Sequence, residues 1–104
     1  MAHRLIYITT ETEADAERIG RALVGERLAA CVNIVGGMRS MYWLDGAVQT
    51  AGETILIAKT RADLVERLTA RVLELHPYDC PCVVSLAIDG GNPAFLRWID
   101  GETA

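Results

Sequence analysis

Three short runs of the sequence are apolar at nearly every position, and this lack of alternation constrains the fold more than any other feature. They span residues 5–8, 55–58 and 83–88. A strand with one face in water alternates apolar and polar residues, so strands of this kind need cover on both faces. Helices of the same chain can cover one face. We expect another copy of the chain to cover the second, because large apolar patches mark interfaces; the C-terminal segment alone is the alternative cover.

The other patterns place these runs in a β-α-β-β-α-β order. The expected strands span residues 5–9, 29–44, 47–60 and 83–88. Helices are expected from a capping box at Thr10 or Thr12 to residue 28, over residues 61–75 and over residues 94–99. This order predicts an α+β fold of the ferredoxin-like type, an antiparallel sheet with two helices on one face, plus a short C-terminal helix. The length favours a single domain over residues 1–104.

Glycines indicate the turn and the irregular positions of the central hairpin. Asp45-Gly46 is a strong signal for the turn. Gly36-Gly37 predicts a bulge or bend in the outgoing strand, and Gly52 predicts a second irregularity in the returning one.

Charge and targeting signals narrow the class of protein. The net charge is −4, which argues against a protein that binds nucleic-acid phosphates through a basic surface. The start of the sequence contains no signal peptide and no lipidation motif, and no apolar stretch is long enough for a membrane span. Three cysteines do not form a disulfide framework. We therefore expect a cytoplasmic protein with reduced thiols and no nucleic-acid or membrane partner.

One cluster has the chemistry of a soft-metal site. His76, Cys80 and Cys82 lie within seven residues, and imidazole and thiolate suit Cu(I) and Zn(II). In an extended segment the two cysteines point the same way. The spacing matches no strong zinc signature, so the alternative is that both cysteines are small hydrophobic residues where the strand over residues 83–88 enters the core. Cys31, within an apolar run, is expected in the core.

Two further pairs have open interpretations. Glu53 and Lys59 are six residues apart on one strand and so share a face; they form either a structural ion pair or part of a pocket. Tyr42-Trp43, just before the hairpin turn, serves either a subunit or partner contact or cross-strand packing within the hairpin. Acidic residues in 11–17 are explained by a helix start. No pattern predicts a catalytic residue.

Several segments together resemble one family. These segments are Leu28–Ile34, Ser40-x-Tyr42 with Gly46, Glu53 to Lys59-Thr60, His76-Pro77-Tyr78 with Pro81, and Phe95-Leu96-x-Trp98. In this order and spacing they resemble the CutA family, the so-called divalent-cation tolerance proteins. The resemblance implies a ferredoxin-like fold, a cytoplasmic homotrimer in bacteria, an architecture related to that of PII signalling proteins, and an association with copper and other divalent cations.

The resemblance also directs attention to particular residues. Cys31 and His76 match family positions, so a metal role carries over to them first. Glu53, Lys59 and Tyr78 are predicted to line a cleft between subunits. Two positions depart from the family pattern: Leu44 stands where the family usually has Trp, and Cys82 stands where it usually has Glu.

Three functions follow as hypotheses. The leading one is a trimeric, non-enzymatic binding or regulatory protein of metal tolerance, with His76, Cys80, Cys82 and Cys31 as candidate copper ligands and no organic cofactor. The second is a structural or scaffolding trimer that contacts protein partners through the hairpin aromatics. The third is a small-molecule sensor, by analogy of fold with PII proteins.

Overall fold

The computed structural model describes residues 2–104 as one antiparallel sheet with helices on one face. The strand order is β2-β3-β1-β4, which confirms the ferredoxin-like α+β prediction. The strands are β1 (His3–Thr10), β2 (Cys31–Leu44), β3 (Ala47–Arg61) and β4 (Val83–Ile88). No helix in the described part of the chain is both long and apolar enough to cross a membrane.

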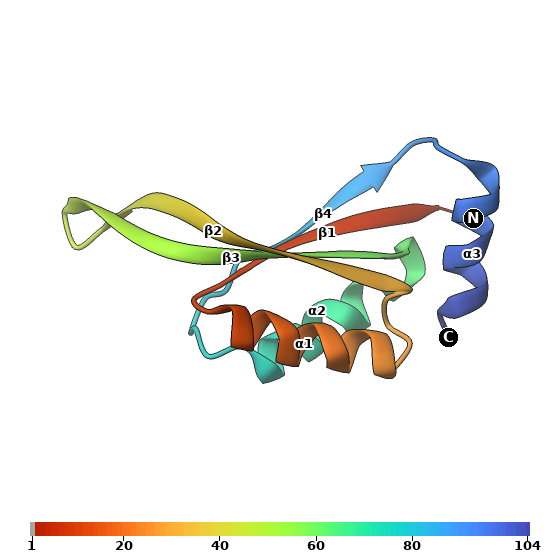
Figure 1. Cartoon of the computed structure of the whole chain (residues 1–104), viewed down its shortest axis with the longest axis horizontal. Helices are drawn as coiled ribbons and strands as arrows, with labels where there is room; N and C mark the ends of the chain where they lie inside the picture. Colours follow the sequence, from red (N-terminus) through yellow and green to blue (C-terminus); the bar gives the residue numbers. More distant parts are fainter. Residues whose placement is uncertain (1) are drawn as a thin grey trace.

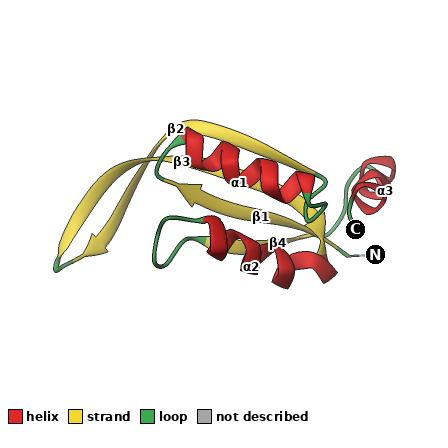
Figure 2. Cartoon of the chain, turned by 90° about the horizontal axis from the view of Figure 1, so that it is seen from below, coloured by secondary structure: helices red, strands yellow, loops and turns green. Residues whose placement is uncertain are grey.

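Two helices cover the lower face of the sheet in Figure 1. Helix α1 (Glu13–Gly25) lies along β2 and β3, and helix α2 (Val65–Leu75) follows a 3₁₀ turn at Ala62–Leu64 and lies toward β4 (Figure 2). The third helix, α3 (Pro93–Glu102), stands at the end of the sheet beside the N-terminus.

Helix α1 begins where its capping signal predicts, but it ends earlier than its apolar spacing predicts. The Thr12 hydroxyl accepts a hydrogen bond from the Asp15 backbone N–H at 3.1 Å, so Thr12 is the N-cap. The helix ends at Gly25 and not at residue 28, because Arg27 has a φ of 62°, a left-handed conformation that terminates helices. Leu28 is buried all the same, since its side chain enters the core from the connection to β2.

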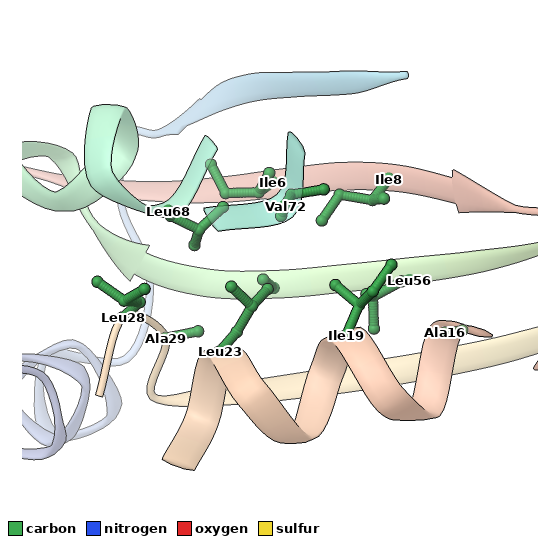
Figure 3. Packing of buried hydrophobic residues seen from close by; sticks show 11 residues of the cluster. Ile6, Ile8, Ala16, Ile19, Leu23, Leu28, Ala29, Leu56, Leu68 and Val72 are labelled. Atoms are coloured by element: carbon green, nitrogen blue, oxygen red, sulfur yellow. The ribbon is translucent and has the colours of Figure 1, made fainter. Parts of the chain in front are cut away.

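The core lies between the sheet and the two helices (Figure 3). Alternate residues of the strands point into it, among them Ile6 and Ile8 of β1 and Leu56 of β3, all fully buried. Ile19 and Leu23 of α1 meet them from the helix layer. Each such side chain contributes about 1.5–3 kcal/mol through burial.

The predicted bulge lies at the glycine pair. Between Val35 and Met38 the pairing of β2 with β3 shifts register, and Gly37 has a φ of 76°, which favours glycine. A Cβ on Gly36 would overlap the Glu13 carboxylate of α1. Gly52 pairs regularly with Arg39, so the prediction of an irregularity there is wrong: glycine tolerates a bulge but does not impose one.

Beyond the bulge the hairpin leaves the sheet as an arm. Strand β1 pairs with β3 only as far as Thr54, so residues 38–53 form a two-stranded extension (Figure 1). We call this extension the arm. It gives the molecule a length of 45 Å against 25 and 22 Å in the other directions. Trp43 pairs with Val48 across the arm, yet it is 73% exposed, so packing within the hairpin covers little of it.

The opposite face of the sheet has no helix layer, and we call it the open face. Its apolar residues include Val35 of β2 and Val84 and Leu86 of β4, each about half exposed. Of the helices in the described part of the chain, α3 alone approaches this face, at one end. The Asp100 carboxylate lies 2.8 Å from Nε2 of His3, and fully buried Ile99 anchors the helix. The strands are thus apolar on both faces, as predicted.

Candidate functional site

A cavity of about 770 Å³ opens where the arm leaves the sheet. Residues of β1 and the turn after it, of the arm and of the loop before β4 line it: Thr9, Glu11, Ser40, Met41, Tyr42, Ala51, Gly52, Glu53, Tyr78, Cys80 and Cys82. The strand register explains this convergence, because Thr9 pairs with Ile55 and Ser40 pairs with Ala51, and paired residues share a face of the sheet. The cavity therefore belongs to the open face.

Tyr78 and Glu53 form the polar centre of the cavity. The Tyr78 hydroxyl donates a hydrogen bond to Oε2 of Glu53 at 3.1 Å. Burial of the phenol, its hydrogen bond to Glu53 and the charges of Glu53 and Glu11 raise the pKa of Tyr78 to about 12, with a smaller contribution from Tyr42. Tyr78 therefore stays protonated at neutral pH and acts as a donor toward the carboxylate.

His76 positions Tyr78 through a hydrogen bond to its backbone. Its Nδ1 accepts a hydrogen bond from the Tyr78 backbone N–H at 3.1 Å, and its Nε2 lies 2.8 Å from the carbonyl oxygen of Thr9. An acceptor at Nδ1 and a donor at Nε2 define the neutral Nε2–H tautomer. The two rings are 4.7 Å apart between centroids. Buried His76 thus ties the end of α2 to β1 and has no ring nitrogen free for a metal ion.

The two thiols that follow lie at the cavity itself. Cys80 and Cys82 are both exposed and both line the cavity. The interpretation of these cysteines as small hydrophobic core residues is therefore wrong. Both lie in the loop before β4, which bends at residues 77–80 and enters the strand at Val83.

The other two predicted site residues lie elsewhere. Lys59 donates a hydrogen bond to Oδ1 of Asn33 at 2.7 Å, and its Nζ lies 5.8 Å from the centroid of the Phe95 ring. It shares the open face with Glu53, as predicted, but six strand residues separate the two by about 20 Å. Within one chain they form neither an ion pair nor one pocket.

Cys31 pairs with Lys59 across β2 and β3, at the α3 end of the open face. It is half-buried and outside the core cluster, so its interpretation as a core residue is wrong. A core position was inferred from the apolar run around it, but the register turns its side chain away from the helices.

A metal centre built from His76, Cys80 and Cys82 does not fit this geometry. In residues 2–104, no group of three or more His, Cys, Asp or Glu side chains is arranged to hold a metal ion. Cys31 is at the far end of the sheet, and His76 is occupied by its own hydrogen bonds. Of the predicted ligands, Cys80 and Cys82 remain as two exposed thiols in the lining of the cavity, and thiolates favour soft ions.

Sequence reasoning missed Glu11, Ser40 and Thr9 as lining residues. Glu11 was explained as part of a helix start, yet it precedes α1 and follows β1 directly. The signal that identifies it is its place at the end of β1, beside the strands that continue as the arm. Ser40 and Tyr42 are two residues apart on β2, so their side chains lie on the same face of the strand.

Comparison with known proteins places this geometry in a family. The family model described as CutA1 divalent ion tolerance protein matches residues 4–102. The Divalent-cation tolerance protein CutA of Thermus thermophilus is 43% identical over 99 residues, which cover 95% of this chain and 96% of that protein. A crystal structure of CutA1 from Oryza sativa superposes with a TM-score of 0.98 at 41% identity, covering 100% of this chain and 95% of that one.

Some relatives are longer than this chain. The chloroplastic CutA 1 protein of Oryza sativa is 43% identical over 99 residues, and the chloroplastic CutA protein of Arabidopsis thaliana is 41% identical over the same length. The matched region is 95% of this chain but only 56% and 54% of those two proteins. The agreement in sequence, length of match and fold is sufficient for one conclusion: the chain belongs to the CutA1 divalent ion tolerance protein family.

Proposed function

We propose that the chain is a non-enzymatic binding protein of divalent-cation tolerance, that it forms one domain, and that it works as a cytoplasmic homotrimer with ligand clefts between subunits. The observation that carries the proposal is the open face. Val35, Val84 and Leu86 expose between 48% and 51% of their surface there, and contiguous apolar surface of this kind marks an interface.

A second copy of this chain is the occupant that the geometry favours. The arm extends well beyond the covered part of the sheet and carries exposed apolar residues such as Met41 and Trp43. An arm of this length can lie across a neighbouring open face and cover what α3 leaves bare. The number of copies, three, is taken from the resemblance to the CutA family.

The cavity supports binding over catalysis. It opens on the same face, so neighbouring subunits of a trimer would border it. Among residues 2–104, its lining offers two thiols and two carboxylates but no imidazole, the commonest general base, and both ring nitrogens of His76, which lies outside the lining, are engaged. A pocket of this size with a few polar groups is typical of ligand binding.

The oligomeric state tests the proposal. Leu86→Asp puts a charge on the open face, whereas Leu73→Asp puts one on α2 at a side chain of equal exposure, 53% against 51%. Native mass spectrometry with light scattering is expected to give a trimer for the wild type and for Leu73→Asp, and smaller species for Leu86→Asp. A monomeric wild type at micromolar concentration would contradict the proposal.

A second candidate function is Cu(I) binding by the thiol pair, which the exposure of Cys80 and Cys82 favours. Anaerobic native mass spectrometry with stoichiometric Cu(I) tests it. One ion per chain is expected, lost in Cys80→Ser/Cys82→Ser and kept in Cys31→Ser, which removes a thiol at the other end of the sheet. A trimer without discrete copper stoichiometry would favour the scaffolding or sensor hypotheses.

A further inference from the structure

We infer that the cavity between the arm and the loop before β4 binds a small organic cation with an ammonium group, held by Glu11 and Glu53 and by the rings of Tyr42 and Tyr78. The inference deepens the proposed function, on which it rests: it names the chemical class of ligand for the same cleft. Among the described residues, the lining contains two carboxylates and no Lys, Arg or His.

The two carboxylates have no cationic partner within the described chain. Oε2 of Glu53 accepts from the Tyr78 hydroxyl, and no donor of residues 2–104 reaches its Oε1. Glu11 forms neither an ion pair nor a side-chain hydrogen bond in this region. The surface glutamates of the helices differ, since Glu17 and Glu26 pair with Arg21 and Arg71. Unpaired carboxylates that line one cavity attract a ligand of positive charge.

Both carboxylates act on Tyr78, which lines the same cavity. Glu53 and Glu11 both oppose ionisation of the Tyr78 phenol, and Tyr42 acts in the same direction. A phosphate or carboxylate ligand would meet the same opposition as the phenolate does. These negative charges argue against an anionic nucleotide as the ligand, because a nucleotide needs basic side chains or backbone N–H groups directed at its phosphates.

The size and the aromatic groups specify an organic cation over a bare metal ion. A volume of about 770 Å³ lies within the range of roughly 300–1,000 Å³ of small-molecule pockets. Tyrosine rings stabilise ammonium groups that lie over their faces. Tyr42 of β2 and Tyr78 of the loop before β4 both line the cavity. Met41 and the two cysteines supply a less polar rim.

Isothermal titration of the full chain tests the inference with choline, its uncharged isostere 3,3-dimethyl-1-butanol, and the diamine putrescine. Binding of choline or putrescine is expected, with no heat from the isostere. A response to choline alone identifies a quaternary ammonium site, and a response to putrescine alone identifies a site for primary amines. Equal binding of choline and its isostere, or no binding of either cation at millimolar concentration, would overturn the inference.

Variants locate the site. Glu53→Gln and Glu11→Gln are expected to weaken cation binding about tenfold each, because each removes one charge without changing the shape. Glu66→Gln, on the exposed surface of α2, is the control and leaves binding unchanged. Tyr42→Phe keeps the ring and the affinity, whereas Tyr42→Leu loses affinity; Tyr42 is 44% exposed, so neither change touches the core. Unchanged affinity in both glutamine variants would also overturn the inference.

Native mass spectrometry of the same samples separates the two proposals. A trimer that binds neither cation would support the proposed assembly and overturn the proposed cation site. A monomer that binds choline or putrescine with the expected variant pattern would contradict the proposed trimer. It would still support the cation site, because every residue that lines the cavity belongs to one chain.

Discussion

The helix-covered body and the arm use the same kind of residue in opposite ways. In the body, Ile6, Ile8 and Leu56 are fully buried by the chain's own helices. In the arm, Met41, Trp43 and Val48 expose 71%, 73% and 64% of their surface. The body therefore gains its stability from its own sequence, whereas the apolar residues of the arm have a stabilising role only when another surface covers them.

The largest effect that tests this comparison is expected in the body. Leu56→Ala removes a fully buried side chain of β3 from the core between the sheet and the helices, and it is expected to lower the free energy of unfolding by about 2–5 kcal/mol. Val48→Ala removes an exposed side chain of the arm and is expected to change it by less than about 0.5 kcal/mol in the isolated chain.

Urea unfolding at several protein concentrations measures both variants. Stability of an assembly depends on concentration, so a cost for Val48→Ala that grows with concentration would identify the arm as an interface. A cost for Val48→Ala as large as that for Leu56→Ala at high dilution would contradict the comparison.

A smaller effect is expected at the junction between the two regions. Gly37 has a φ of 76° in the bulge, and a side chain in this left-handed conformation costs about 1–2 kcal/mol. Gly37→Ala should lower the free energy of unfolding by that amount. Gly52→Ala, in the regular part of the arm with open space around its Cβ position, is the matched control and should have little effect. Equal costs at the two glycines would show that the bulge conformation does not matter.

The sequence was sufficient for the elements that depend on local signals. The Asp45-Gly46 turn and the Gly36-Gly37 bulge lie where the pattern predicts them, and the helix predicted over residues 61–75 is present as a 3₁₀ turn at Ala62–Leu64 followed by α2 over Val65–Leu75. The end of α1 was misjudged because Leu28 continues the apolar spacing, although the left-handed Arg27 has already ended the helix. Apolar periodicity reports burial, and a residue outside a helix can be buried as well.

The candidate site was harder to predict because it depends on register. Glu53 and Tyr78 were chosen separately from Cys80 and Cys82, yet all four line one cavity. Lys59 and Glu53 share a face, but a shared face sets no distance along the strand. Glu11 was not predicted as a site residue because the start of a helix already explained an acidic residue at its position. These relations follow from pairing between distant strands, which a single sequence does not contain.

The most local effect concerns the cavity at the base of the arm and is measured in an alkaline titration. The pKa of Tyr78 is about 12 in the folded chain against 10.0 for a free tyrosine. The unfolded chain therefore releases this proton first as the pH rises, so the contribution of Tyr78 to stability is complete below pH 10 and is lost between pH 10 and 12. In Tyr78→Phe this part of the decline should be absent, and so should the last phase of phenolate absorbance.

Glu53→Gln sharpens the same titration, because the causes of the raised pKa differ in size. Burial of the phenol is the largest cause, and the hydrogen bond to Glu53 and its charge come next. Removing the charge should lower the pKa of Tyr78 from about 12 but leave it above 10, since the burial is unchanged. A return to the ordinary value would mean that the carboxylate alone controls the phenol. No change would mean that Glu53 does not act on Tyr78 in solution, and the base of the arm would then lack the negative centre that distinguishes it from the rest of the open face.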